Sequence, residues 1–514
     1  MSTGERRQDG DTIPDNRPDI EEVRARRAAR LDENRPEAVA KRRKTGHWTV
    51  RESIGAFIDA DSFLEYGALA KPIDPAMEGV ADGTIIGTAR VGGSPCAILA
   101  YDYTVLAGSG GHIGYLKHER IFRLALEQRL PVVCWLEGGG HRPHDLKHGS
   151  GMYLPAFFTF AQLSGWVPLV GIVTGRCFAG NANLAGMCDV VIATPKSSIG
   201  MAGPALIEPG LGRKVTPEEI GPLEVQVPSG VVDLEAEDEA HAIALARQFL
   251  GYFRGRQAPG EAPDVSKLTG LVPPNLRRAY NMRRVVEHIV DVDTFLELRP
   301  RFGKAIITGL ARIEGHPVGV LANSPMYLSG AMDTPASDKM ARFIQLCDAH
   351  DIPLLFLCDT PGLMVGPDVE KTGLVRHSAR MLVHLAAATV PKFTVILRKF
   401  YGMGGVLMGS KIFNPNLIIG WPTAEWGAMG MEGAASLIYR NELAAAPDEA
   451  TRQRLLVEFT ADLKRRSTGI EVAGKFEIDD IIDPVDTRRF LAQALATVPT
   501  PPLRQVRKHV VDPW

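Results

Sequence analysis

The chain has 514 residues, of which 45% are hydrophobic and 23% are charged, and its formal net charge is -2 at pH 7. This composition is typical of a globular protein, and the length is typical of two to four domains. The near-neutral charge gives no reason to expect nucleic acid or an anionic membrane surface as a partner.

The six cysteines form no CxxC pair, and most of them lie in apolar segments. This pattern favours reduced, buried thiols in a cytoplasmic protein. Residues 1–45 are polar and charged, so that no secretory signal is visible, and the apolar segments are far too short to span a bilayer. We therefore expect a cytoplasmic protein that does not enter a membrane.

The first 45 residues form an arm that differs from the rest of the chain. Residues 1–17 lack periodicity and predict a disordered lead-in, whereas residues 19–45 predict helices that are broken near Pro36. The helical part is basic, with Arg24, Arg26, Arg27, Arg30, Lys41, Arg42, Arg43 and Lys44. One interpretation is a solvated basic helix, and the other is a contact for a nucleotide phosphate or a partner subunit.

The remainder of the chain contains a long internal repeat. Gly93, Pro95 and Gly108 recur as Gly315, Pro317 and Gly330, and Lys117, Arg120, Pro131 and Gly140 recur at the same offset as Lys339, Arg342, Pro353 and Gly362. A period this long indicates a duplicated domain rather than a solenoid. Two copies of one fold can hold two ligands against each other, which favours group transfer. We place the first repeat at 46–255, a Pro- and Gly-rich linker at 256–274 and the second repeat at 275–514.

Each repeat alternates short apolar segments with helical patterns. Strands are expected at 97–100, 132–136, 169–173 and 190–193, and again at 318–322, 354–358, 394–397 and 417–419. Residues 118–129 and 339–350 carry apolar residues at helical spacing. Strands that are apolar on both faces and alternate with helices predict an α/β fold with largely parallel pairing.

The standard nucleotide, zinc-protease and serine-hydrolase motifs are absent, and glycine-rich strand ends remain. Two expected strands end in 137–141 and 359–363, and their neighbours lead into 175–181 and 399–405. Glycine at such places lets a ligand approach the main chain and frees amide N–H groups at a helix start. Two such loops on neighbouring strands can aim converging donors at one oxygen, which is an oxyanion hole.

Residues 175–193, followed by 198–201, resemble the acyl-CoA oxyanion segment of the crotonase superfamily. The doubled form resembles the carboxyltransferase (β) subunits of biotin-dependent acyl-CoA carboxylases. Supporting segments are 61–67, 347–362, 398–402, 421–425 and 482–488, and the similarity covers roughly residues 20–500. The resemblance implies two tandem crotonase-like (ClpP/crotonase) α/β domains of ββα repeats.

The resemblance also implies a reaction. Such enzymes move a carboxyl group from carboxybiotin, carried on a separate chain, to the α-carbon of an acyl-CoA through an enolate. The first repeat would bind the acyl-CoA, and the second repeat of a partner protomer would receive the biotin. Catalytic residues carried over from the family are Ala179, Gly180, Met403 and Gly404, and residues of the binding loops are Gly139, Gly140, Gly362, Gly402, Gly405 and Val406.

The implied partners are a biotin carboxylase or biotin carrier subunit, because the chain contains no Ala-Met-Lys-Met biotinylation site. The family also implies a homo-oligomer, either a trimer or a hexamer. Two departures from the family pattern bear on the substrate. The turn at residues 402–404 has Met403 in place of a small residue, and Val406 stands where short-chain enzymes often carry a selectivity-setting Asp.

Several side chains have two interpretations. His141, His144 and His148 match no firm metal spacing and favour a solvated or CoA-proximal loop, so that no metal site is predicted. Arg176 and Arg213 are candidates for contacts with CoA phosphates or for ordinary surface pairing, and Trp421 and Trp426 are expected to pack in the core rather than to stack on a ligand. Glu425 is a candidate acid–base group. Alternative functions are a biotin-independent carboxy-acyl-CoA decarboxylase of the crotonase type and a non-catalytic acyl-CoA-binding scaffold.

Overall fold

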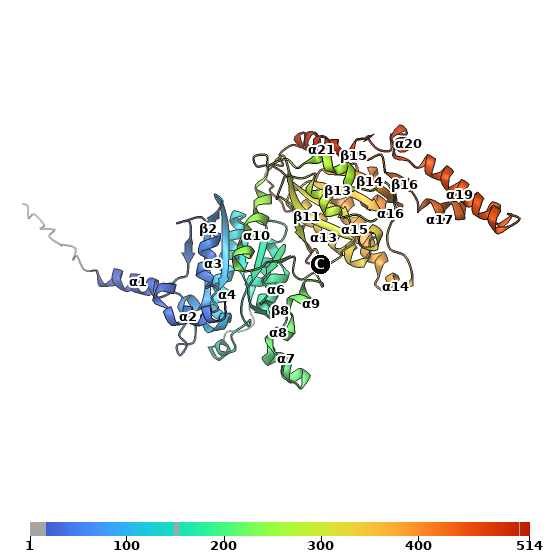
Figure 1. The fold of residues 1–514 in the computed structure, drawn as a ribbon. Coiled ribbons are helices and arrows are strands. Elements are labelled where there is room, and N and C mark those ends of the chain that lie inside the picture. Colours follow the sequence, from blue (N-terminus) through green and yellow to red (C-terminus); the bar gives the residue numbers. More distant parts are fainter. Residues whose placement is uncertain (1–16, 149–153, 503) are drawn as a thin grey trace, which may run out of the picture.

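The computed structural model describes residues 17–148, 154–502 and 504–514, so that nearly all of the expected disordered lead-in lies outside the described residues. Each repeat builds one large sheet, and the two sheets lie one after the other along the molecule (Figure 1). The strand order is β1-β2-β3-β4-β5-β7-β9 in the first and β10-β11-β12-β13-β14-β15-β17 in the second, with β16 beside β14. This mixed α/β architecture with two similar sheets confirms the expected fold class.

The first repeat contains β1 (Leu64–Tyr66), β2 (Thr84–Val91), β3 (Ser94–Tyr101), β4 (Val132–Trp135), β5 (Leu169–Val173), β6 (Arg176–Phe178), β7 (Val190–Ala193), β8 (Ser198–Gly200) and β9 (Leu234–Glu235). The second contains β10 (Leu296–Leu298), β11 (Ile306–Ile313), β12 (His316–Asn323), β13 (Leu354–Thr360), β14 (Lys392–Tyr401), β15 (Leu417–Gly420), β16 (Glu425–Gly427) and β17 (Asp480–Ile481). The first three strands of each sheet are antiparallel, and the following strands are parallel. The eight expected strands are therefore confirmed.

The helices of the arm and first repeat are α1 (Pro18–Ala28), α2 (Pro36–Lys44), α3 (Val50–Phe57), α4 (His112–Gln128), α5 (Pro155–Leu163), α6 (Gly180–Gly186), α7 (Pro204–Leu211), α8 (Pro217–Ile220), α9 (Leu223–Gln226) and α10 (Glu239–Gly251). Those that follow are α11 (Leu268–Leu271), α12 (Met282–Glu287), α13 (Thr334–Ala349), α14 (Pro367–Glu370), α15 (Leu374–Ala387), α16 (Gly402–Leu407), α17 (Met431–Ile438), α18 (Arg440–Ala444), α19 (Glu449–Arg466), α20 (Gly469–Gly474) and α21 (Thr487–Ala496). The two expected helices form as α4 and α13. The helix α13 begins earlier than its apolar pattern predicts, because the Asp333 carboxylate accepts from the Ala336 amide and caps the first turn.

The backbone itself records the duplication. Leu106, Ala107 and Arg129 have positive φ angles, and so do the residues 222 positions later, Leu328, Ser329 and Asp351. A left-handed backbone costs a residue other than glycine roughly 1–2 kcal/mol. Its recurrence at a constant offset indicates that both repeats keep the same local path even where the side chains differ.

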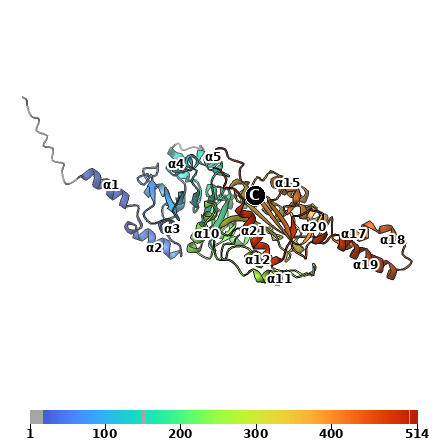
Figure 2. The ribbon, with the colours of Figure 1, turned by 90° about the horizontal axis from the view of Figure 1, so that it is seen from above.

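The two ends of the molecule carry projecting helices. The helix α1 extends from one end and the α17–α19 segment from the other, as two perpendicular views show (Figures 1 and 2). The helix α19 contains no buried residue. Within the described ranges, no helix combines the length and apolar character that crossing a membrane requires.

The basic arm is attached to the first repeat by three largely buried ion pairs, besides the surface pair of Arg43 and Glu52. Arg30 pairs with Glu65 at 3.0 Å, Arg35 pairs with Asp102 at 3.0 Å, and the buried Arg42 pairs with Glu137 at 2.6 Å. The interpretation as a solvated helix holds for the exposed Arg24, Arg26, Arg27, Lys41, Arg43 and Lys44. Neither interpretation anticipated that part of the arm would be anchored inside the same chain.

The C-terminal tail, residues 504–514, contacts both repeats. Ser164 of the first repeat donates to the carbonyl of Val511 at 3.0 Å, and Arg342 of the second donates to the carbonyl of Pro513 at 3.2 Å. His509 lies 2.9 Å from Asp348. The tail therefore joins the two repeats through polar contacts.

The buried pair of Arg42 and Glu137 predicts a large effect of Arg42→Met on stability. Both side chains are more than nine-tenths buried, and removing one partner of a buried pair costs roughly 3–5 kcal/mol. The control is Arg43→Met on the same helix, because Arg43 pairs with Glu52 at the surface and such pairs contribute about 0–1 kcal/mol. In urea unfolding, the midpoint concentration should fall clearly for Arg42→Met and not for Arg43→Met. Equal midpoints of the two variants would contradict an anchoring role of Arg42.

The contact between His509 and Asp348 predicts a pH-dependent stability. The Asp348 carboxylate accepts a hydrogen bond from His509 and raises the pKa of this histidine above its usual value, against partial desolvation. The pair therefore stabilises the fold fully below pH about 6.5, and its contribution is lost as the pH rises through the raised folded-state pKa. The melting temperatures of the wild type and of His509→Gln should differ most near pH 5.5 and converge near pH 8.5. A difference that grows with pH would contradict this contact.

Candidate active site

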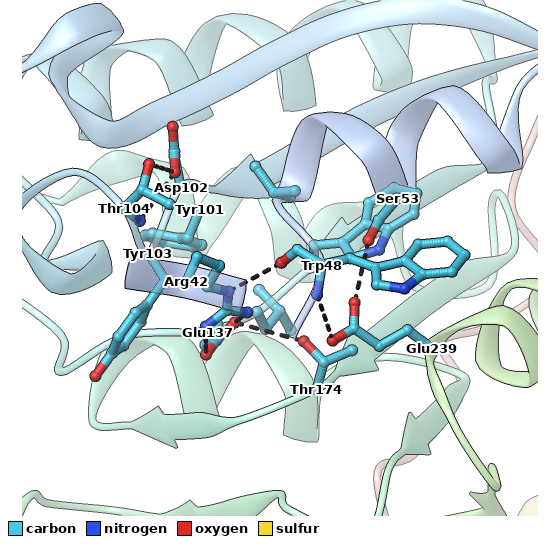
Figure 3. Close-up of a pocket in the computed structure, with 13 residues that line it drawn as sticks. Arg42, Trp48, Ser53, Tyr101, Asp102, Tyr103, Thr104, Glu137, Thr174 and Glu239 are labelled. Carbon is cyan, nitrogen blue, oxygen red and sulfur yellow. Dashed lines mark hydrogen bonds and ion pairs between the residues drawn. The ribbon is translucent and has the colours of Figure 1, made fainter. Parts of the chain in front are cut away.

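The loop after β4 begins with a buried carboxylate. Glu137 accepts two hydrogen bonds from Arg42, at 2.8 and 2.6 Å, and Arg42 also donates to the carbonyl of Trp48 at 2.9 Å. Figure 3 shows Arg42 facing Glu137, with Thr174 of the neighbouring strand end beside them. Because a buried carboxylate requires a paired cation, this contact ties the start of the glycine loop to the arm.

The loop after β13 has the same design with a different partner. Asp359 stands 222 residues after Glu137 and accepts from Arg398 of β14 at 2.8 Å. Arg398 also donates to the carbonyls of Pro273, Asn275 and Arg278 at 2.9–3.1 Å. Each glycine loop is therefore fixed to a segment at the start of its own repeat, residues 42–48 in the first and 273–278 in the second.

The two glycine loops share one backbone hydrogen-bond pattern. In the first, Gly110 donates to the carbonyl of Gly140 at 2.7 Å and accepts from the Arg142 amide at 2.8 Å. In the second, Met332 does the same with Gly362 and Met364, at 3.2 and 2.9 Å. Successive amides of an extended segment point to opposite sides, so those of His141 and Leu363 point away from these partners. Neither of these two amides has an acceptor among the described residues.

The loops lie against the neighbouring turns at distances that only glycine permits. A β-carbon on Gly140 would lie 2.6 Å from the β-carbon of Ala179 and 3.5 Å from the amide nitrogen of Gly180. A β-carbon on Gly404 would lie 2.5 Å from the carbonyl carbon of Gly362. The expected pairing of loops from neighbouring strands is therefore present in both repeats.

Each neighbouring turn starts a short helix, and the two starts are equivalent. Gly138 bridges Cys177 in the first repeat, and Thr360 pairs with Phe400 in the second. Ala179 therefore corresponds to Gly402, and their φ angles agree at 53° and 54°. The expected pairs Ala179–Gly180 and Met403–Gly404 are consequently offset from each other by one residue.

Because of this offset, Ala179 and Gly180 have different roles. The amide of Ala179 donates to the carbonyl of Gly200 at 3.1 Å, so it is not free for a ligand. The amides of Gly180, Met403 and Gly404 belong to the first turns of α6 and α16 and have no backbone acceptor among the described residues. Ala179 thus shapes the turn, and Gly180 carries the free donor.

The remaining expected binding residues surround these turns. Gly139 is exposed and has open space where a β-carbon would lie. A β-carbon on Gly405 would lie 2.9 Å from the carbonyl carbon of Phe400, and one on Gly402 would lie 3.0 Å from the carbonyl oxygen of Ala428. Val406 is half-buried on α16.

Aromatic side chains beside Gly180 were not anticipated from the sequence. A β-carbon on Gly180 would lie 3.0 Å from the Phe157 ring and 3.7 Å from the Tyr115 hydroxyl, and His141 stacks on Tyr115. Burial raises the pKa of Tyr115 to about 12 and lowers the pKa of the neighbouring His118 to about 3. These two groups therefore stay neutral at pH 7. No local motif marks them, because Tyr115 and His118 lie in α4, far from the glycine loops in sequence.

The other candidate side chains have protein partners. Arg176 pairs with Glu218 at 2.8 Å, and Arg213 pairs with Glu219 at 3.6 Å, both at the surface. Trp421 is buried and donates to Thr487 at 2.9 Å, and Trp426 is partly buried against Phe400. Glu425 accepts from Tyr401, and burial together with this carboxylate raises the pKa of Tyr401.

The loop that carries the three histidines, residues 141–148, is held in place by Arg142. Arg142 is buried, pairs with Asp82 at 2.7 Å and donates to the carbonyl of Ser109 at 3.1 Å. His144 is exposed, and His148 lies 3.4 Å from Asp74. Over the described ranges, no three His, Cys, Asp or Glu side chains come together as a metal site.

Known proteins share this arrangement. The family model described as the carboxyl transferase domain matches residues 41–511. A biotin-dependent long-chain acyl-CoA carboxylase β4 subunit of Mycobacterium tuberculosis is 34% identical over 511 residues, which cover 96% of this chain and 97% of that subunit.

Two solved structures are also similar. A single-chain, multi-domain long-chain acyl-CoA carboxylase has a TM-score of 0.87 and 46% identity over 93% of this chain, which spans only half of the length of that enzyme. The transcarboxylase 12S hexamer, solved with methylmalonyl-CoA bound, has a TM-score of 0.84 and 33% identity over 95% of this chain and 96% of its own. The protein therefore belongs to the carboxyl transferase family, among the carboxyltransferase subunits of biotin-dependent acyl-CoA carboxylases.

Proposed function

We propose that this chain transfers a carboxyl group from N1′ of carboxybiotin to the α-carbon of an acyl-CoA. The observation that carries the proposal is the pair of equivalent glycine turns with free amides, one in each repeat. The α-carbon gains a carboxylate and loses a proton, and the biotin nitrogen loses the carboxyl group and gains that proton. Each half of this exchange develops one anion, and two anions require two sets of donors.

The turn of the first repeat, at Ala179–Gly180, binds the acyl-CoA. Removing the α-proton places negative charge on the thioester oxygen, and the amides of Gly180 and His141 are free to donate to it. Ala179 and Gly140 keep these donors in place through the close contact of their loops. Donors that are fixed before the reaction need no reorganisation when the charge develops, which makes each one effective.

The turn of the second repeat, at residues 402–404, binds the biotin. Its free amides belong to Leu363, Met403 and Gly404, and the close approach of Gly404 to Gly362 keeps these donors near one another, as donation to a ureido oxygen requires. Carboxybiotin, when bound there, would supply the carboxyl group and a ring nitrogen able to accept the α-proton. This chain therefore needs no catalytic histidine or glutamate of its own. Gly402, Gly405 and Val406 line the same turn, and Gly139 extends the first one.

The reaction requires partners. The two turns belong to separate sheets, and no hydrogen bond or ion pair among the described residues joins them. We propose a trimer or hexamer in which the first turn of one protomer faces the second turn of another, supported by the hexamer of the 12S relative. A biotin carboxylase or biotin carrier chain would bring the biotin. The six free, buried cysteines support a cytoplasmic location.

A second candidate function is decarboxylation of a carboxy-acyl-CoA without biotin. The exposed Met403 favours it, because a long side chain stands at the turn that would receive the biotin ring. The two functions separate in one assay, since only the carboxyltransferase requires biotin as donor or acceptor.

Gly180→Pro should remove one donor while keeping the helix. Gly180 is the first residue of α6, where proline is tolerated because its amide has no intrahelical partner. We expect carboxyl transfer to fall about 10²–10³-fold. The matched control is Gly180→Ala, which keeps the N–H and should retain activity within a few-fold. The measurement is transfer from a carboxy-acyl-CoA to free biotin, with circular dichroism as a check on folding. Equal activities in the two variants would refute donation by Gly180.

Val406→Asp should change the preference for acyl-chain length. Val406 is half-buried on the helix that starts at the second turn, and a carboxylate there would have to lose water to accept an apolar chain. We expect the ratio of kcat/KM for long-chain over short-chain acyl-CoA to fall at least tenfold. Val406→Ala serves as the control without charge. An unchanged substrate profile for Val406→Asp would exclude Val406 as a selectivity residue.

A further inference from the structure

Four segments without a single charged residue meet at the second turn. They are residues 326–331, 360–366, 402–408 and 427–431. The hydroxyl of Thr360 donates to the carbonyl of Gly330 at 2.8 Å, and Gly404 lies against Gly362. The turn residue Gly402 packs against the carbonyl of Ala428. Segments far apart in sequence therefore meet beside the free amides of the turn, and the Lys399 ammonium reaches them where it donates to the Ser329 carbonyl at 2.9 Å.

Large apolar side chains of these segments are exposed. Val365 is 81% exposed, Met326 65%, Met403 48% and Met429 40%, and Leu328 and Met364 lie beside them in the same segments. We call these six residues the methionine rim. Single exposed apolar residues are ordinary, but a group of them around a reactive turn indicates a binding surface.

The first repeat keeps only one residue of this rim, because Leu106 corresponds to Leu328 and the other five positions differ. Thr104 corresponds to Met326, Arg142 to Met364, Pro143 to Val365, Gly180 to Met403 and Ala202 to Met429. The backbone of the two turns is nevertheless the same, so the rim is not needed to build the turn. At these five positions the methionines and Val365 are found in the second repeat only.

We propose that the methionine rim binds the hydrocarbon chain of a medium- or long-chain acyl-CoA. The inference rests on the proposed function, because transfer requires the α-carbon to approach the carboxyl group within about 3–3.5 Å. The chain beyond the α-carbon then starts within a few ångströms of the second turn and lies along the rim. Unbranched methionine side chains adapt to a flexible chain of variable length, whereas an acetyl group would need no such surface.

The test measures dissociation constants of butanoyl-, octanoyl- and dodecanoyl-CoA for the full-length oligomer by calorimetry. Each methylene moved from water into apolar contact changes an equilibrium constant by up to about fourfold. We expect dodecanoyl-CoA to bind at least tenfold more tightly than butanoyl-CoA. The double variant Met326→Thr with Met429→Ala, which installs the residues of the first repeat, should lower this ratio at least tenfold. The control Val383→Thr changes an exposed apolar residue of α15 and should keep the ratio.

The other outcomes each decide the matter. Tight binding that does not depend on chain length would overturn the rim proposal while leaving the carboxyltransferase proposal intact. Absence of binding for every acyl-CoA would overturn both. Dissociation of the oligomer in the double variant, measured by sedimentation, would show that the methionine rim is a contact between subunits, and it would overturn the proposal. An equal loss of affinity for all chain lengths would also overturn the proposal.

Discussion

The buried pairing of one carboxylate with one guanidinium in each repeat is the constraint on which the rest of the site depends. Glu137 and Asp359 stand at the ends of equivalent strands, immediately before the glycine loops, and neither can remain charged in the interior without a cation. The cations come from outside the loops, from the arm for Glu137 and from β14 for Asp359. Strand end, loop and preceding segment therefore form one unit, and the amides of the loop are fixed before any ligand arrives.

The two repeats show how one backbone path is kept while the side chains around it differ. Both loops keep the same hydrogen bonds, a positive φ at the equivalent Gly140 and Gly362, and a close approach of glycine to the neighbouring turn. The side chains have diverged: the first loop carries a buried Arg142 paired with Asp82, and the second carries the uncharged Met364 at the corresponding position. Donation by the main chain is insensitive to side-chain identity, so the side chains were free to specialise.

This arrangement also explains why no titrating side chain of the protein is required at the turns. Glu425 accepts from Tyr401, and His118 is a buried group that stays neutral. A reaction in which one substrate supplies the base needs stabilised anions and correct positioning rather than a titrating side chain. The buried charged side chains hold the glycine loops in place, and the main-chain amides at the turns have no acceptor among the described residues.

The sequence by itself determined the duplication, the strands, the α/β class and the positions of the glycine turns, because these depend on local apolar patterns and on residues that recur at one offset. It did not determine that Arg42 would pair with Glu137, that Tyr115 and Phe157 would border Gly180, or that the amide of Ala179 would be used by Gly200. Each of these depends on a partner that is distant in the chain, and sequence spacing carries no information about which distant group fills a given space. The one-residue offset between the two turns likewise became visible only through strand pairing, since short glycine-rich segments align equally well in more than one register.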